Sequence, residues 1–135
     1  MAQPRSVLLD THVLLWMIAE PQKVGRKTRD LLESPDVQLR LSTASLFEIA
    51  VKYSLKKLPL PETPAAYLPR YLDQMGVVDL AVDRYHAFRV TQLPWHHRDP
   101  FDRLILAQSL VEKLPLVTAD EQLMDYKVTI VDARV

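Results

Sequence analysis

The chain has 135 residues, of which 48% are apolar and 25% are charged, and this composition predicts a globular protein rather than a disordered one. It contains no cysteine, which excludes disulfides, thiolate nucleophiles and cysteine-ligated zinc. Lysine plus arginine and aspartate plus glutamate both number 17, so the net charge gives no support to a nucleic-acid partner. Such binding would depend on a local basic patch or on an acidic pocket that metal makes attractive to anions.

Hydrophobic periodicity predicts strands that alternate with helices along the first half of the chain. In chain order we expect a strand at 7–9, helices at 11–19 and 25–34, a strand at 37–41, and helices at 42–57 and 64–74. The last of these helices should break or restart at Pro69, because proline lacks the amide hydrogen that a helix uses.

The second half of the chain continues the alternation. The pattern predicts a strand at 77–82, a helix at 84–91 capped by Asp83, and a loop at 93–98. These are followed by a helix at 100–113 opened by Asp99 and Pro100, a strand at 115–118, a short helix at 119–126 and a last strand at 128–131. This order predicts an α/β fold, a three-layer αβα sandwich with a mainly parallel central sheet, in one domain covering 1–135. In such folds, ligands bind beyond the carboxyl ends of the strands, where the strand order reverses.

No targeting or membrane segment is expected. The apolar stretch near the N-terminus is interrupted by Asp10 and His12, and no run approaches the roughly 20 apolar residues that span a bilayer. We therefore expect a cytoplasmic protein without membrane contact. The chain has only two glycines and no glycine-rich phosphate loop, so phosphate chemistry would need metal and side chains.

Four carboxylates lie where separate segments turn into predicted helices: Asp10, Glu48, Asp102 and Asp120. A parallel fold would bring such positions together, and like charges that close repel by roughly 4 kcal/mol per pair. A hard divalent cation such as Mg²⁺ or Mn²⁺ removes that repulsion, because it prefers oxygen ligands and leaves room for water and phosphate. The pattern predicts metal-dependent phosphodiester chemistry.

Each carboxylate also has a structural alternative as a helix cap. Asp10 and Asp99 fit N-cap positions, Ser45 with Glu48 fits a capping box, and Thr118 with Glu121 fits another, which leaves Asp120 near a positive helix end. A paired-charge network of Asp99 and Asp102 with Arg98 and Arg103 is a further alternative. Basic residues near these positions are candidates for phosphate contact, although a solvated surface explains them equally well: Lys52, His97, Arg98 and Arg103.

The motifs together resemble a PIN-domain nuclease, and most closely a VapC-type toxin of a bacterial toxin–antitoxin pair. They are Val7-Leu8-Leu9-Asp10-Thr11-His12, Ser45-x-x-Glu48-Ile49, Arg98-Asp99-Pro100-Phe101-Asp102-Arg103 and Val117-Thr118-Ala119-Asp120. The resemblance implies an αβα fold, Mg²⁺- or Mn²⁺-dependent endoribonuclease activity, a homodimer, and a small antitoxin whose C-terminal segment blocks the active site. It assigns the catalytic carboxylates to Asp10, Glu48, Asp102 and Asp120, adds Asp99 as a further metal-site carboxylate, and gives Thr11 and Thr118 an orienting role.

On this reading, Asp10 and Asp102 hold the main metal, while Glu48 and Asp120 act through water or help a second ion. The metal activates a water molecule for attack on phosphorus and neutralises charge on the phosphate. Two alternatives stay open: a metal-dependent DNA nuclease or phosphatase that uses the same pocket, and a regulatory module with a PIN fold but no activity.

Overall fold

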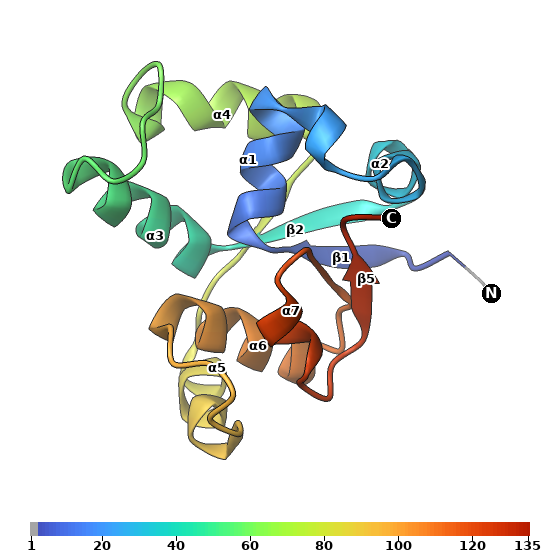
Figure 1. Cartoon of the computed structure of the whole chain (residues 1–135), viewed down its shortest axis with the longest axis vertical. Coiled ribbons are helices and arrows are strands. Elements are labelled where there is room, and N and C mark those ends of the chain that lie inside the picture. Colours follow the sequence, from blue (N-terminus) through green and yellow to red (C-terminus); the bar gives the residue numbers. More distant parts are fainter. Residues whose placement is uncertain (1–2) are drawn as a thin grey trace.

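The computed structural model describes residues 3–135. Within them, five strands form one fully parallel sheet with the order β3-β2-β1-β4-β5 (Figure 1). The strands are β1 (Ser6–Leu9), β2 (Gln38–Ser42), β3 (Val78–Leu80), β4 (Leu116–Thr118) and β5 (Ile130–Asp132). The predicted parallel sheet is confirmed.

Helices connect the strands and cover both faces of the sheet. They are α1 (Thr11–Ala19), α2 (Arg26–Glu33), α3 (Thr43–Ser54), α4 (Pro64–Met75), α5 (Arg84–Arg89), α6 (Pro100–Glu112) and α7 (Glu121–Met124), with short 3₁₀ helices η1 (Pro21–Lys23) and η2 (Val90–Gln92). Figure 1 shows α1, α2 and α4 on one side of the strands and α5 and α6 on the other. The three-layer arrangement follows the prediction.

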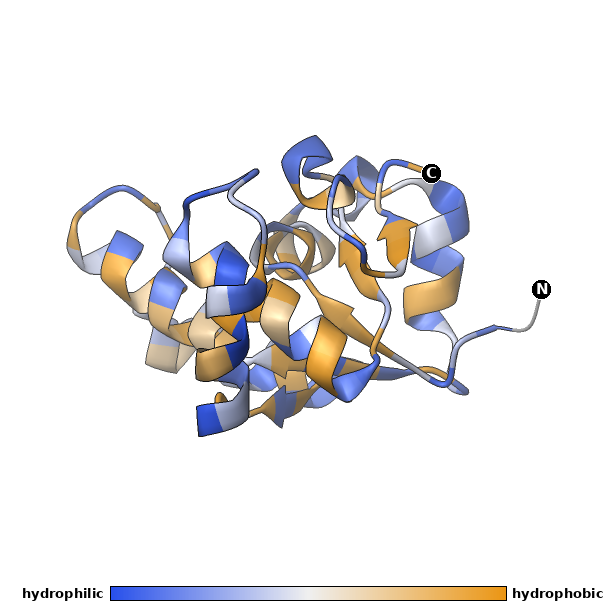
Figure 2. Ribbon diagram, turned by 90° about the horizontal axis from the view of Figure 1, so that it is seen from below, coloured by the Kyte–Doolittle hydropathy of each residue, from blue (hydrophilic) through white to orange (hydrophobic). Residues whose placement is uncertain are grey.

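The alternation of side chains along β1 separates the two halves of the core. Val7 and Leu9 belong to one cluster of buried residues, with Leu14, Ile49 and Leu68 from α1, α3 and α4. Leu8 points to the other face and belongs to a second cluster that contains residues of α6 and α7. Figure 2 shows these apolar strands enclosed between helices with hydrophilic outer turns. Burial on both faces explains why β1 is apolar throughout.

The strand order reverses between β1 and β4. The chain begins in β1, moves outward through β2 to β3, and then returns to the other side of β1 to form β4 and β5. Leu9 of β1 is in register with Val117 of β4, so these two strands end side by side. This is the place where parallel αβα folds bind ligands.

Several predicted boundaries were wrong. Helix α4 continues through Pro69, so the expected break is absent; the carbonyl that loses its partner belongs to the exposed Ala65, where water can replace it. The predicted helix at 84–91 ends at Arg89 and gives way to η2. Helix α7 is shorter than predicted, because Asp120 caps it from just outside.

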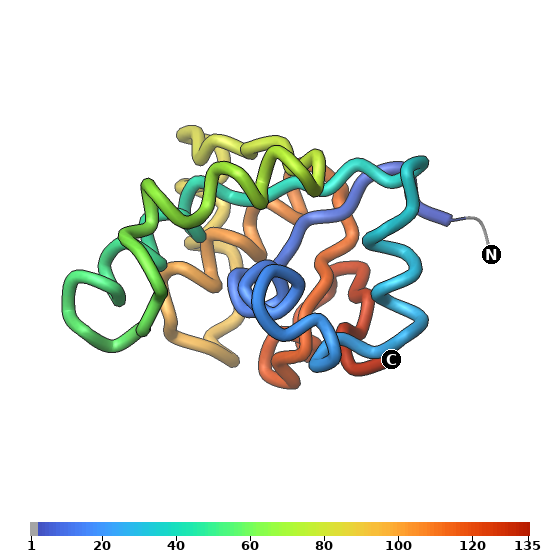
Figure 3. The backbone as a smooth tube through the Cα atoms, turned by 90° about the horizontal axis from the view of Figure 1, so that it is seen from above, coloured from blue at the N-terminus to red at the C-terminus, as the bar shows by residue number. Residues whose placement is uncertain are grey.

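The C-terminal segment packs against the start of α2, as Figure 3 shows from above. The amide of Gly25 donates to the carbonyl of Ala133 at 2.8 Å, and a Cβ at this glycine would lie 2.2 Å from the carbonyl carbon of Val135. Only glycine permits so close an approach of two backbones. None of the helices in residues 3–135 has the length and hydrophobicity to cross a membrane.

Candidate active site

The sheet brings the ends of β1 and β4 together and with them two of the predicted carboxylates. Asp10 directly follows β1, and its amide donates to the carbonyl of Val117 at 2.9 Å. Asp120 lies two residues beyond the end of β4. Both residues are therefore at the reversal point of the strand order, as their positions after predicted strands indicated.

Asp10 is buried and does not cap α1. Only 4% of the residue is exposed, and its side chain makes no capping bond although it occupies the N-cap position. Instead, the hydroxyl of Thr118 donates to Oδ2 of Asp10 at 2.7 Å. Burial raises the pKa of Asp10, with the charge of Glu48 adding to it, while the Thr118 bond and His12 act in the opposite direction. The capping alternative is wrong for Asp10.

Glu48 is held from two sides on helix α3. The hydroxyl of Thr11 lies 2.8 Å from Oε1 of Glu48 and 2.8 Å from the hydroxyl of Ser45, and Lys52 lies 2.6 Å from Oε2. The predicted Ser45–Glu48 capping box is wrong, because α3 begins earlier and Ser42 caps it by accepting from the amide of Ala44 at 3.0 Å. Glu48 is 3% exposed and faces the β1–α1 junction.

Asp102 reaches the pocket from the first turn of α6. His97 Nε2 lies 2.6 Å from its Oδ2, and 17% of the Asp102 side chain is exposed. The pKa of Asp102 is raised to about 7, chiefly by burial and then by the charges of Asp10, Asp99 and Glu48, while the His97 hydrogen bond acts in the opposite direction. Because the charges of Asp10 and Glu48 affect the pKa of Asp102, these three carboxylates lie close enough to interact electrostatically.

Asp99 and Asp120 both cap helices. Asp99 Oδ1 accepts from the amides of Phe101 and Asp102 at 2.9 and 3.0 Å, so the N-cap alternative is confirmed for this residue. Asp120 Oδ1 accepts from the amide of Gln122 at 2.9 Å, and this cap replaces the predicted Thr118–Glu121 box. Capping uses one oxygen of each carboxylate and leaves Oδ2 without a capping bond.

A compact group of potential metal ligands results. One ligand atom each from His97, Asp102 and Asp120 lie within 4.8 Å of one another. The hydroxyl of Thr118 links this group to Asp10, because it donates to Asp10 and accepts from the amide of Asp120 at 3.0 Å. Thr118 and Thr11 thus each donate a hydrogen bond to one of the carboxylates, Asp10 and Glu48 respectively.

The predicted RNA-contact residues fall into different environments. Arg98 is exposed, and Lys52, whose side chain is 36% exposed, pairs with Glu48. The prediction for Arg103 does not fit the structure: it is 2% exposed and its guanidinium donates to backbone carbonyls, so no phosphate can reach it. No ion pair joins Arg98 or Arg103 to a carboxylate in residues 3–135, so the arginine-network alternative is wrong as well.

Sequence reasoning missed three roles. It offered His97 as a possible phosphate contact but not as a partner of Asp102, it gave Ser45 only a capping role, and it gave Tyr126 no role. The hydroxyl of Tyr126 accepts from the amide of His97 at 2.9 Å and fixes its backbone. The one sequence signal for this contact was that His97 precedes Asp102 by five residues. The loop that carries His97 has no periodicity from which the contact could have been predicted.

Comparison with known proteins identifies the family to which this chain belongs. The PIN domain model matches residues 7–128. The chain belongs to the PIN-domain family. It is 29% identical to Ribonuclease VapC22 of Mycobacterium tuberculosis over 123 residues, which cover 90% of this chain and 92% of that protein.

Solved structures share the PIN fold. VapBC2 from Rickettsia felis, bound to a DNA fragment from its promoter, matches with a TM-score of 0.72 at 16% identity, over 94% of this chain and 98% of that one. VapBC-5 from Mycobacterium tuberculosis, a member of the VapBC family of toxin-antitoxin systems, matches with a TM-score of 0.58 at 22% identity, over 98% and 100% of the two chains.

The PIN site of this chain fits a divalent cation. Burial and neighbouring carboxylate charge raise the pKa of Asp10 and of Asp102, and Lys52 forms its ion pair with Glu48. Oxygen ligands from Asp102 and Asp120, with a nitrogen from His97, form a donor set suited to a borderline or hard metal ion. The family and these residues together indicate divalent-metal chemistry.

Proposed function

We propose that this PIN domain is a Mg²⁺- or Mn²⁺-dependent endoribonuclease. The observation that carries this proposal is the convergence of the buried Asp10 and Glu48 with the half-buried Asp102 at the strand reversal, where burial and then the charges of the neighbouring carboxylates raise the pKa of Asp102 to about 7. Such unsatisfied negative charge is costly unless a cation is bound. The ribonuclease name of the VapC22 relative supports RNA as the substrate.

Asp10 and Asp102 are proposed as the main metal ligands, with Glu48 and Asp120 completing the site and Asp99 contributing charge. A bound divalent cation supplies the activation of water and the neutralisation of charge on the scissile phosphate. The protein's own contribution is orientation: Thr118 aims Asp10, and Thr11 aims Glu48, each through a buried hydrogen bond. His97 orients the carboxylate of Asp102 through its 2.6 Å contact with Oδ2.

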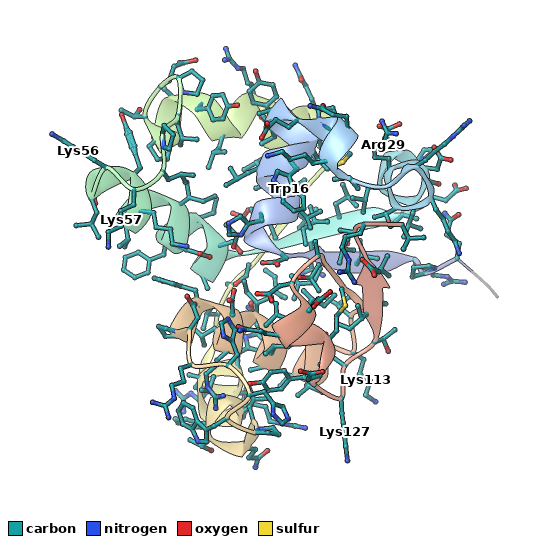
Figure 4. The ribbon with its side chains drawn as sticks, in the orientation of Figure 1. Trp16, Arg29, Lys56, Lys57, Lys113 and Lys127 are labelled. Atoms are coloured by element: carbon teal, nitrogen blue, oxygen red, sulfur yellow. The ribbon has the colours of Figure 1, made fainter. Side chains whose placement is uncertain are left out.

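Phosphate contacts are proposed for Lys52, His97 and Arg98, which lie at or near the pocket and retain exposed surface. Lys56 and Lys57 are less suitable, because Figure 4 shows them at the end of α3 that is farthest from the strands. The near-zero net charge means that attraction of RNA depends on such local groups and on the bound cation.

The test compares substrates and metals on purified protein. RNA, DNA of the same sequence and a small phosphomonoester are incubated with Mg²⁺, with Mn²⁺ and with chelator. The proposal expects cleavage of RNA only, and only with metal, and loss of cleavage in Asp10→Asn. Cleavage of DNA or of the monoester would favour the alternative enzymes, and no cleavage of any substrate would favour a regulatory module.

A cognate antitoxin and a homodimer are proposed as partners. The solved neighbour VapBC-5 is a member of a family of toxin-antitoxin systems, and this supports a similar pairing here. Co-expression with a small neighbouring reading frame should restore growth to cells that express this chain and should inhibit RNA cleavage by the purified pair. Light scattering of the chain alone should give twice the mass of 15.5 kDa; a monomer would contradict the dimer.

A further inference from the structure

Trp95 presents an exposed aromatic face on the loop that leads to the active site. It lies in the loop between η2 and α6, and 69% of the residue is exposed. The guanidinium carbon of Arg103 lies 3.8 Å from the centre of the indole ring. Since Arg103 is itself 2% exposed, it covers one face of the indole from inside the protein, and the other face points outward.

The loop that carries Trp95 is fixed by buried hydrogen bonds. Arg103 donates to the carbonyls of Val90, Leu93, Pro94 and His97 at 2.9–3.2 Å. The hydroxyl of Tyr126 donates to the carbonyl of Pro94 at 2.9 Å and so ties the loop to the α7 side of the molecule. Both neighbours of the Trp95–His96 pair are therefore anchored, and little conformational entropy remains to be lost when a ligand binds to the indole.

The same loop connects Trp95 to the proposed chemistry. His97 is two residues from Trp95, a span of at most about 7 Å along the backbone. Its ring contacts Asp102 at 2.6 Å. The loop therefore carries both the exposed indole and a side chain that contacts the carboxylate pocket.

The charge around Trp95 suits a polyanion. Of the basic residues in 84–98, Arg84, Arg89, His96 and Arg98 are exposed and form no ion pair within residues 3–135, whereas His86 is buried against Glu112 and His97 contacts Asp102. The residues close to Trp95 in the chain, Pro94, His96 and Arg98, are exposed, and the other large exposed apolar side chains of this segment, Tyr85 and Phe88, belong to α5. A protein partner would require a wider apolar contact, whereas a nucleic-acid base requires one π face with cations nearby.

We infer that the outer face of Trp95 is a stacking platform for one base of a single-stranded RNA substrate, held next to the scissile phosphate. The inference rests on the proposed ribonuclease function and adds a specificity residue to it. Arg103 supports the platform from behind, both by a cation–π contact and by fixing the loop. Stacking accepts every base but favours purines, whose rings are larger.

Cleavage kinetics test the platform. Trp95→Ala should raise KM for a single-stranded RNA of about 12 nucleotides by roughly 5- to 150-fold, with kcat little changed. Trp95→Phe should restore most of the affinity, because it keeps a π face. The matched control is Tyr85→Ala: Tyr85 is 68% exposed, nearly the same as Trp95, but it lies on α5 and is not joined to the pocket. An unchanged KM in Trp95→Ala, or an equal rise in Tyr85→Ala, would overturn the inference.

Fluorescence tests stacking without removing Trp95. The chain has two tryptophans, so Trp16→Phe leaves Trp95 as the only indole. In this background, with Asp10→Asn to prevent cleavage and Mn²⁺ present, oligoadenylate should quench the emission saturably, and oligouridylate should do so more weakly. This measurement stays valid even if Trp95→Ala disturbs the loop. The absence of quenching at RNA concentrations that saturate binding would exclude stacking.

The two assays separate this inference from the proposed function. Quenching by RNA in a protein that cleaves no RNA would refute the nuclease and keep the platform. Metal-dependent cleavage without quenching would keep the nuclease and refute the platform. If an antitoxin, and not RNA, quenches Trp95, the exposed indole is a protein contact and the inference fails.

Discussion

Two groups in this protein, each made of two carboxylates and one histidine, have ligand atoms at similarly short distances, but only one group has the character of a metal site. The pocket group consists of His97, Asp102 and Asp120, and the cap group consists of Asp83, His86 and Glu112. In each group, one ligand atom per residue falls within the same 4.8 Å limit. Distance alone therefore does not distinguish a site from a structural cluster.

The cap group uses its hydrogen-bonding capacity within the fold. His86 Nδ1 accepts from the amide of Asp83 at 3.0 Å, while Nε2 lies 2.9 Å from Glu112. Asp83 Oδ1 accepts from the amides of Tyr85 and His86 and completes a capping box at the start of α5. A metal ion bound here would have to displace the cap of α5, so we interpret the cap group as structural.

The pocket group retains destabilised charge in spite of the His97–Asp102 contact and the cap that Asp120 provides to α7. Asp102 has its pKa raised to about 7 by burial and by the neighbouring carboxylates, of which Asp10 has the largest effect. It also lies at the reversal of strand order, which the cap group does not. Destabilised charge at a ligand-binding position, and not proximity, marks the functional cluster.

The largest expected effect is on catalysis. Asp102→Asn should lower metal-dependent RNA cleavage by about a thousandfold or more, because a metal ligand contributes several kcal/mol to transition-state stabilisation. Asp83→Asn, in the cap group, should leave the rate per folded molecule unchanged. Single-turnover cleavage of labelled RNA measures both, and equal losses in the two variants would remove the distinction between the groups.

The next largest effect is on stability, and we expect it in the cap group instead of the pocket group. His86 is 1% exposed, so His86→Ala should lower the free energy of unfolding by about 2–3 kcal/mol through lost packing and an unpaired Glu112. Urea denaturation measures the loss. Cleavage by the fraction that remains folded should be normal; a specific loss of cleavage would assign the cap group a functional role.

The third effect concerns metal affinity. Protons compete with a cation for Asp102, whose pKa is about 7, so the affinity for Mn²⁺ should rise by about tenfold from about pH 6 to about pH 8. Titration calorimetry at several pH values measures the slope. Asp83→Asn should show the same slope as wild type, whereas a pH-independent affinity in wild type would contradict ligation by Asp102.

The sequence was sufficient for the fold and for which carboxylates converge. The apolar run before Asp10 indicates a doubly covered strand, and parallel strands bring their carboxyl ends to one edge, so Asp10 and Asp120 could be placed together in advance. The same pattern of strands separated by helices located Glu48 and Asp102 on flanking helices. These inferences depend on periodicity and order, which a sequence carries directly.

The contacts within the site could not be predicted in the same way. Whether Ser45 caps its helix or faces Thr11 depends on a shift of three residues in the helix start, which periodicity does not fix. The burial of Arg103 depends on the path of the loop over 90–97, which has no repeating pattern. Interactions decided by loop conformation need the structure.

The smallest expected effect is on the stability of the metal-free protein, and its sign distinguishes the pocket group from the cap group. The pKa of Asp102 rises from an ordinary 3.8 to about 7 in the folded protein, so between these values the folded state binds more protons than the unfolded state. The stability of the metal-free protein must therefore fall as the pH rises from about 4 to about 7, and above that range the full penalty is present. Asp102→Asn removes the buried charge and should stabilise the metal-free protein at pH 8 by about 1 kcal/mol, with less gain at pH 5.

Urea denaturation in chelator, at both pH values, measures this difference. The control is Asp83→Asn, which keeps a good helix cap on α5 and should change the stability little at either pH. A gain for Asp102→Asn that does not change with pH would mean that the carboxylate is not held at a raised pKa. A loss would mean that its bond to His97 outweighs the repulsion from Asp10, and the pocket group would then be structural in the same sense as the cap group.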